Sequence, residues 1–413
     1  MTAQTYYHSK QRSGVRSGNA RILQYYAVIS LFAFGTALKP FLGADNRNLL
    51  LIGLMGLSPI FVLRALQIRK SHLTLYLYMG SILLFPPVIN PEHLRWSTIL
   101  FSMMFSLSFI AYENALWGSR MEIETFIKAI RFLLLAYFVV LVIQQIGVLT
   151  GLPILNESNY NAELGWKLNA LAAEASHTAR NVSVLMFAYL ALEEVRTGKK
   201  YAFKPLFRRD KYLWLGYALM TLTMQSTTAF IFAPLILFKV SNRRNIGFVV
   251  GALAIAVMAV TSFASDVFGR ASTFVEAAFT FDYQLVMAAD HSGSMRVAPM
   301  FVLMDKVELF SFAGLFGHGI DSVSTFMSDY IYGVYEGFTG GGMLQLWYEY
   351  GFITFALFVA FTLRIASALK SVANFIFWLL IVFTAGPNNQ ILWFFLIVFA
   401  SVEHFRIMAA RES

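Results

Sequence analysis

The chain has 413 residues, of which 58% are hydrophobic and only 13% are charged. A soluble domain of this size would carry about a quarter charged residues, so the composition excludes an ordinary soluble protein. The net charge of +9 would suit nucleic-acid binding in a soluble protein, but here the basic residues follow a membrane-topology pattern, and we expect no nucleic-acid partner.

The apolar residues fall in blocks long enough to cross a bilayer as helices, which takes about 20 residues each. We predict an all-α polytopic membrane protein with about 12 transmembrane helices. Residues 1–413 form one integral membrane domain, because no polar stretch is long enough to fold separately. The basic N-terminal segment precedes the first span without a small-residue cleavage site, which favours a retained span. The predicted spans are 22–40, 48–66, 72–90, 96–113, 125–148, 180–195, 212–225, 227–240, 245–265, 350–366, 372–386 and 390–404.

Lysine and arginine are distributed unequally between the two sides of this scheme. With the N-terminus inside, roughly three quarters of the 32 basic residues fall in cytoplasmic segments, as the positive-inside rule requires. The scheme therefore predicts that both termini are cytoplasmic and that two segments face outward. These are residues 150–179 and a large outer loop over residues 266–342, between spans nine and ten.

The first outward segment ends in EASHTAR, at the start of span six. Glu174, His177 and Arg180 are three residues apart, so on a helix they lie on one face of successive turns. A carboxylate, an imidazole and a guanidinium in one patch could orient a hydroxyl group and neutralise an anion. The alternative is a solvated helix start, with Glu174 near the positive end of the helix and Arg180 extended to the interface.

The second outward segment carries two arginines, Arg270 and Arg296, against the orientation bias. A guanidinium group can bind a phosphate through two parallel hydrogen bonds, so both are candidates for an anion site. The alternative for each is an interfacial anchor. Arg296 begins the amphipathic run RVAPMFVLMDKVELF, which we expect to lie along the membrane surface.

Two glycine-containing stretches close this segment. LFGHGIDS contains His318 between two glycines and is typical of a tight turn. GGGMLQLWYEYGF begins with glycines that permit a re-entrant turn, and its Leu344, Trp347 and Tyr348 share one helix face. These aromatic side chains suit either a membrane-interface belt or stacking against sugar rings, and the belt is the commoner explanation.

Other kinds of site have little support. Cysteine is absent, the histidines are scattered, and neither HxxxH nor HExxH occurs, so we expect no metal. The chain has no P-loop and no GxGxxG for a nucleotide, and no GxSxG for a hydrolase serine. We therefore predict no cofactor.

Three stretches resemble the O-antigen polymerase and ligase superfamily of membrane glycosyltransferases. EASHTAR resembles the EPSH-type motif of exopolysaccharide polymerases, with Ala175 where proline is usual. SGSMRVAPMFVLMDKVELFSFAGLFGHGIDS resembles a pattern of serine and arginine, an aliphatic helix and a G-x-G turn. GGGMLQLWYEYGF resembles the leucine-rich helix after the large periplasmic loop. The resemblance covers spans six to ten and the outer loops, and the N-terminal spans match only in hydropathy.

The resemblance implies a GT-C-like fold and a Wzy-type polymerase of the bacterial inner membrane, with a periplasmic active site. Such an enzyme joins oligosaccharide repeats linked to undecaprenyl diphosphate, by inverting transfer without a metal. By resemblance, Arg296 holds the donor diphosphate, and Arg270 or Arg180 is the second arginine. His177 or Glu174 would be the general base, and we place His318 among the substrate-binding residues.

The resemblance also implies a chain-length regulator and a flippase as partners, besides the lipid bilayer. Two alternatives stay open. A ligase would transfer finished glycan to another acceptor, but the histidine that ligases place ahead of the glycine-terminated helix is replaced here by Gly340, Gly341 and Gly342. A polysaccharide or solute transporter usually has internal repeats and polar residues at mid-membrane, and the sequence has neither.

Overall fold

The computed structural model describes residues 14–42, 48–64, 69, 72–158, 160, 167–199, 207–224, 226–240, 247, 251, 265–289, 291–308, 310–331 and 341–412. These residues form helices and connecting turns, with an isolated antiparallel bridge between Leu42 and Asn48. The predicted helical class is confirmed. Nearly all of the predicted ninth span lies outside the described residues. Arg270 and Arg296 lie on described helices, but their side chains are outside the description.

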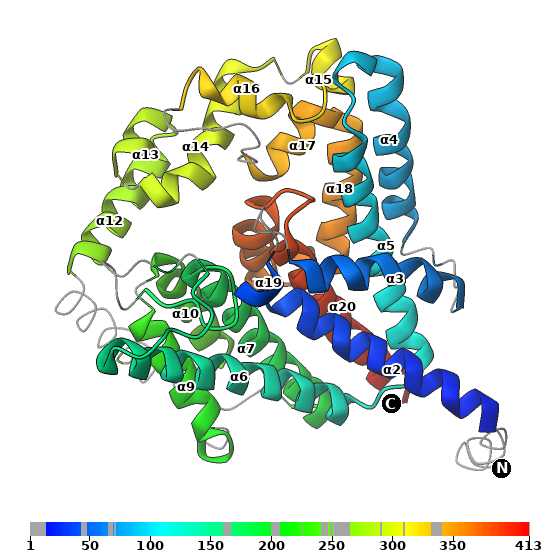
Figure 1. Ribbon diagram of the computed structural model, residues 1–413, viewed down its shortest axis with the longest axis vertical. Coiled ribbons are helices and arrows are strands. Elements are labelled where there is room, and N and C mark those ends of the chain that lie inside the picture. Colours follow the sequence, from blue (N-terminus) through cyan, green and yellow to red (C-terminus); the bar gives the residue numbers. More distant parts are fainter. Residues whose placement is uncertain are drawn as a thin grey trace.

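The helices follow one another along the chain as drawn in Figure 1. The longer ones are α2 (Gly14–Gly35), α3 (Leu49–Arg64), α4 (Leu73–Ile89), α5 (Trp96–Ser119), α6 (Ile123–Thr150), α7 (Ala175–Thr197), α9 (Lys211–Thr223), α10 (Thr227–Lys239), α12 (Ser265–Phe279), α14 (His291–Lys306), α18 (Phe352–Ile365) and α20 (Gln390–Glu412). The shorter ones are α13 (Tyr283–Ala289), α15 (Phe312–Phe316), α16 (Ser322–Ser328), α17 (Gly342–Tyr350), α19 (Val372–Phe377), the 3-10 turns η1 (Lys39–Phe41), η3 (Pro91–His93) and η5 (Ala368–Lys370), and the π-helical turn η6 (Trp378–Phe383).

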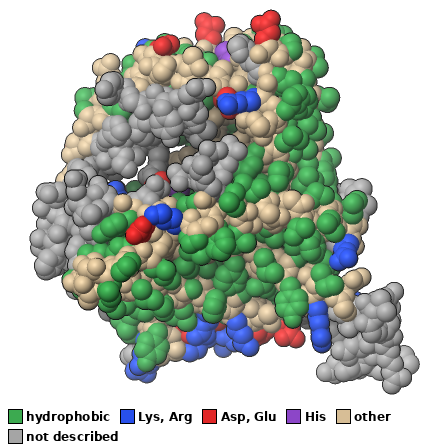
Figure 2. Space-filling model, in the orientation of Figure 1, with side chains coloured by type: hydrophobic (Ala, Val, Ile, Leu, Met, Phe, Trp, Pro, Cys, Tyr) green, Lys and Arg blue, Asp and Glu red, His purple; other side chains and the backbone are tan. Residues whose placement is uncertain are grey.

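Three of the described helices are long and apolar enough to cross a membrane, namely α5, α6 and most of α20, and five shorter apolar helices accompany them. Large apolar side chains such as Leu63, Leu84 and Phe132 are exposed on the outside of the bundle. Figure 2 shows hydrophobic side chains over much of the face between the charged upper and lower edges. Such a surface would favour aggregation in water and is suited to lipid. The structure thus supports a helical membrane protein, and the count of twelve spans stays a prediction.

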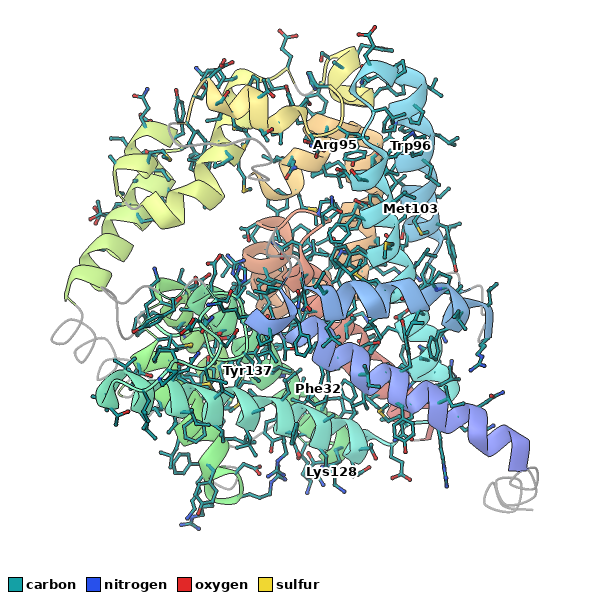
Figure 3. The ribbon with its side chains drawn as sticks, in the orientation of Figure 1. Phe32, Arg95, Trp96, Met103, Lys128 and Tyr137 are labelled. Atoms are coloured by element: carbon teal, nitrogen blue, oxygen red, sulfur yellow. The ribbon has the colours of Figure 1, made fainter. Side chains whose placement is uncertain are left out.

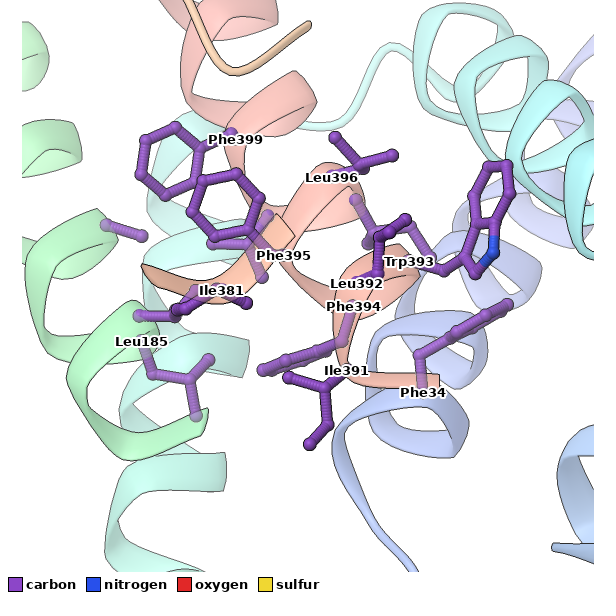
Figure 4. Close-up of a cluster of buried hydrophobic side chains, with 14 of the residues drawn as sticks. Phe34, Leu185, Ile381, Ile391, Leu392, Trp393, Phe394, Phe395, Leu396 and Phe399 are labelled. Carbon is purple, nitrogen blue, oxygen red and sulfur yellow. The ribbon is translucent and has the colours of Figure 1, made fainter. Parts of the chain in front are cut away.

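Helix α20 forms the centre of the larger core. It packs against α7, α2 and α5. A helix that is apolar around its whole circumference is expected to be buried, and Trp393 is fully enclosed. Figure 4 shows side chains of α20 directed toward several neighbouring helices at once, with Phe34 on one side and Leu185 on another.

Buried carboxylates join three helices at one end of the bundle. The side chain of Asp210 is fully buried and is paired with Arg131 at 3.0 Å and with Arg209 at 2.7 Å. Glu193, at the end of α7, is paired with Arg196 at 2.6 Å and with Arg209 at 3.1 Å. Buried carboxylates require such partners, because an unpaired charge in a low-dielectric interior is costly.

We call this end of the molecule, where α7 finishes and α9 begins, the basic end. Figure 2 shows lysine and arginine side chains gathered along this lower edge. Figure 3 places Lys128 at the same edge, and Arg95 and Trp96 near the upper edge. We call the end that carries Arg95 the opposite end.

The segment predicted as the large outer loop is mostly helical. It contains α12 to α16, which form an arch over the upper part of Figure 1 and pack on a small core of their own. Val302, Leu303, Val323 and Met327 are buried in that core together with the apolar face of α17. The amphipathic runs of this segment therefore bury their apolar faces against one another, which a loop assignment based on polarity does not foresee.

Candidate functional site

The EASHTAR stretch begins α7. Glu174 has an extended backbone and immediately precedes the helix, which starts at Ala175. His177 Nε2 lies 3.7 Å from Glu174 Oε1, and the Ser176 hydroxyl donates to Glu174 Oε2 at 3.0 Å. The predicted proximity of Glu174 and His177 is therefore present, and both side chains are partly exposed. An imidazole beside a carboxylate at an accessible helix start can accept and return a proton.

Arg180 lies one turn further along α7 and is 6% exposed. The alternative interpretation, an arginine extended to the interface, is therefore wrong for this residue. The neighbouring Asn181 amide donates to the carbonyl of Gly35 at 3.2 Å and to the hydroxyl of Tyr137 at 3.0 Å. A buried guanidinium inside a membrane bundle is costly and commonly serves a function.

Three amides fold the preceding polar segment against the bundle. Asn156 donates to the carbonyls of Ala170 at 2.7 Å and Ala172 at 3.1 Å. Gln144, on α6, donates to the side chain of Asn169 at 2.9 Å. Because these bonds satisfy buried backbone groups, they fix where α7 begins and hold the Glu174–His177 pair in place.

The G-x-G turn packs on the end of α17. Gly317 and Gly319 both have left-handed backbones, with φ of 102° and 109°, so the predicted glycine turn is confirmed. His318 donates its backbone N–H to the carbonyl of Tyr348 at 2.8 Å, and its ring Nδ1 is 3.0 Å from the same oxygen. The imidazole of His318 is stacked on the ring of Tyr348, with the ring centres 4.3 Å apart. The second and third resembling stretches are therefore in direct contact.

The glycine run places α17 against the bundle. Gly341 and Gly342 have left-handed backbones, and Gly342 lies so close to the carbonyl of Phe383 that no side chain fits. All nine residues of α17 are buried. Leu344, Trp347 and Tyr348 all lie in the small core, so the predicted shared face is confirmed.

A buried carboxylate on α17 was missed by the sequence reasoning. Glu349 is 3% exposed; it accepts from the backbone N–H of Val323 at 3.4 Å and from the Gln345 amide at 3.4 Å. Burial raises the pKa of Glu349 to about 8, and the negative charge of Asp321 adds to the increase. The four-residue spacing of Gln345 and Glu349 indicates that the two side chains meet on one helix face, but it does not indicate that they are buried.

Asp321 ties this group to the start of α5. Its carboxylate accepts from Arg95 at 3.1 Å and from the Thr98 hydroxyl at 2.9 Å. Asn90 donates to the carbonyl of Gly317 at 2.8 Å. The G-x-G turn is thus attached both to α17 and to the connection between α4 and α5.

We expect Glu349→Gln to change how the stability of the protein depends on pH. Because the folded state binds the Glu349 proton more tightly than the unfolded chain, stability falls as pH rises from about 4.5 to about 8, and this loss is complete above that range. Glutamine keeps the shape without the titration. Thermal melting at pH 6 and pH 9 should show a smaller loss for Glu349→Gln than for the wild type. An equal loss in both would mean that this carboxyl titrates normally.

The connection 384–390 links the two motif regions. Gly386 lies against the Gln345 side chain of α17. The Ser102 hydroxyl donates to Asn388 at 2.5 Å. Gln390 donates to the carbonyls of Phe34 at 2.8 Å and Thr36 at 2.9 Å, beside the Gly35 carbonyl that Asn181 reaches. The connection 384–390 therefore lies beside α17 at Gly386, and at Gln390 it binds the carbonyls that flank the one bound by Asn181 of α7.

The predicted site residues fall into three groups. Glu174, His177 and Arg180 are together at the start of α7. His318 belongs to the turn between α15 and α16, in the upper part of Figure 1, whereas α7 lies in the lower part. Arg270 is on α12 and Arg296 on α14, two helices of the arch that contact each other.

Among the residues that the structure describes, no group of three or more His, Asp or Glu side chains is placed to hold a metal ion. Comparisons of the chain with protein-family models, with curated proteins and with solved structures give no match.

Proposed function

We propose that the protein is a membrane glycosyltransferase that polymerises oligosaccharide repeats carried on undecaprenyl diphosphate. The observation that carries the proposal is the placement of the three resembling stretches. EASHTAR opens α7 with an accessible carboxylate–imidazole pair one turn from the buried Arg180. The G-x-G turn and the glycine-run helix pack together, and the amide-rich connection 384–390 joins the two regions.

In the proposed reaction, a hydroxyl group of one lipid-linked repeat attacks C1 of the first sugar of another. The bond between C1 and the diphosphate oxygen breaks, the configuration at C1 inverts, and undecaprenyl diphosphate leaves with the bonding electrons. His177 or Glu174 takes the proton of the attacking hydroxyl, a step typically worth a hundred- to ten-thousand-fold in rate. Arg180, Arg270 and Arg296 would stabilise the negative charge that develops on the leaving group.

We propose that the active site faces the periplasm and that both termini are cytoplasmic. Support comes from the ion pairs that join different parts of the chain. Two ion pairs each connect two segments predicted to face outward: Lys39 with Glu157, and Arg95 with Asp321. Three other ion pairs each connect two segments predicted to be cytoplasmic: Arg131 with Asp210, Lys239 with Glu194, and Lys370 with Glu403.

A ligase is the nearest alternative, because it would use the same donor and the same leaving group. The glycine run favours the polymerase, since Gly342 contacts backbone where a histidine side chain has no room. The proposed partners of the polymerase are a chain-length regulator and a flippase, as the resemblance implies.

The proposal is tested in a strain that lacks the protein and is complemented with wild type, Arg296→Ala or His177→Ala. Lipid-linked glycans and surface polysaccharide are separated side by side, with membrane protein levels matched. We expect single repeats to accumulate without long polymer in the null strain and in both variants. Long polymer retained on the lipid carrier would instead identify a ligase, and repeats trapped in the cytoplasm a transporter. Full activity of both variants would remove these residues from the site.

A further inference from the structure

A cavity of about 260 Å³ lies at the basic end, toward the opposite end of α7 from the EASHTAR stretch. It lies between the ends of α7, α10 and α20 and the turn from η5 to α19. The residues that line it are Phe187, Ala191, Lys239, Ala366, Ser367, Lys370, Ser371, Asn374, Phe399, Val402, Glu403 and Arg406.

The charged lining is predominantly cationic. Lys370 and Arg406 both contact the Glu403 carboxylate at 2.6 Å. Lys239 is paired with Glu194, which is not part of the lining, at 2.5 Å. Three cations and two carboxylates therefore surround the cavity, and the excess of one positive charge would attract an anion that enters it.

The rest of the lining is divided between polar and apolar groups. Ser367, Ser371 and Asn374 supply two hydroxyls and an amide. The rings of Phe187 and Phe399 are stacked with their centres 5.7 Å apart, and the Lys239 ammonium lies 5.6 Å from the Phe187 ring centre. A cavity with a cationic rim and an aromatic wall fits a ligand that has an anionic group beside an apolar part.

The surroundings of the cations indicate where that ligand comes from. Exposed apolar side chains adjoin each of the three cations in the sequence: Phe238, Leu369 and Ile407. Leu369 is 83% exposed, as expected of a side chain that faces lipid. Cations next to exposed apolar groups are typical of the membrane interface, where lipid phosphates lie.

We propose that this cavity binds a phosphate-bearing anion, namely the headgroup of an anionic phospholipid from the adjoining leaflet. Basic pockets between membrane helices are suited to such headgroups, and each lysine or arginine near the surface strengthens the attraction several-fold. Free phosphate offers the same chemistry from the aqueous side, and the experiment distinguishes the two sources. The proposal is independent of the glycosyl-transfer reaction.

The test measures lipid binding to purified protein in a nonionic detergent by native mass spectrometry. Dioleoyl-phosphatidylglycerol should bind at least ten times more tightly than dioleoyl-phosphatidylcholine. Lys370→Gln combined with Arg406→Gln should weaken phosphatidylglycerol binding about 25-fold, at roughly fivefold for each cation. Glu403→Gln should strengthen it about fivefold, because a competing negative charge is removed.

The opposite signs expected for these variants separate ligand binding from misfolding. Lys128→Gln is the matched control: this exposed lysine lies at the same end but outside the cavity lining, and its loss should leave affinity unchanged. Inorganic phosphate that competes at micromolar concentration would assign the site to a soluble phosphate, and no competition at millimolar concentration assigns it to lipid. The proposal would be overturned if phosphatidylglycerol and phosphatidylcholine bound with equal affinity and phosphate did not bind. An unchanged affinity for phosphatidylglycerol in the Lys370→Gln, Arg406→Gln variant would also overturn it.

Discussion

Replacing Arg180 by alanine is expected to lower the rate of polymer formation by at least about 100-fold, while the protein still inserts in the membrane. Loss of one preorganised donor to a developing oxyanion typically costs this much or more. Arg180 is enclosed one turn beyond the Glu174–His177 pair, where water cannot take over its role. The measurement is the initial rate of glycan extension by purified protein in liposomes.

Two further variants separate catalysis from structure. Arg180→Lys keeps the charge but loses the planar pair of donors, so it should recover part of the rate without reaching the wild-type value. Arg208→Ala removes an exposed arginine at the basic end and should leave the rate unchanged. If folded Arg180→Ala kept the wild-type rate, or if Arg180→Lys melted normally and had full activity, the assignment of Arg180 to the diphosphate would be wrong.

Gly351→Ala is expected to destabilise the protein by at least about 3 kcal/mol. The backbone at this position is left-handed, with φ of 86°, which alone costs a residue with a side chain roughly 1–3 kcal/mol. A Cβ atom would also overlap the carbonyl of Leu315, which belongs to α15 and cannot rotate away as a side chain can. The melting temperature in detergent, followed by loss of the native elution peak, measures the effect.

Gly151→Ala is the matched control for this substitution. Its backbone is also left-handed, with φ of 71°, but nothing lies within 4 Å of the added Cβ. It should cost only about 1 kcal/mol. Similar melting temperatures for the two variants would show that the contact between the G-x-G turn and the end of α17 is not close-packed.

Local patterns in the sequence predicted several features of the motif regions. Glycines at 317, 319, 341 and 342 indicated left-handed turns, and all four have them. The three-residue spacing in EASHTAR placed Glu174 near His177, as observed. These predictions succeeded because each depends on the backbone geometry of a few neighbouring residues, which the chain specifies locally.

Other features depend on contacts between distant residues. The burial of Glu349 requires that residues 317–323 pack across α17, and no local pattern contains that information. The side-chain amides of Asn156 and Gln390 donate to backbone carbonyls of residues that are distant in the sequence. No local pattern around either residue indicates these bonds. Residues 266–342 were predicted as a large outer loop with an amphipathic run along the membrane surface, but their apolar residues form helices that shield one another.

The most direct test of the account uses one purified component. The protein is placed in liposomes with a single synthetic repeat linked to undecaprenyl diphosphate, in the presence of a metal chelator, and the products are separated by chain length. We expect glycans of two or more repeats on one lipid carrier, with one undecaprenyl diphosphate released for each new linkage. Repeats that stay single, or that appear only as water-soluble monomers, would contradict it.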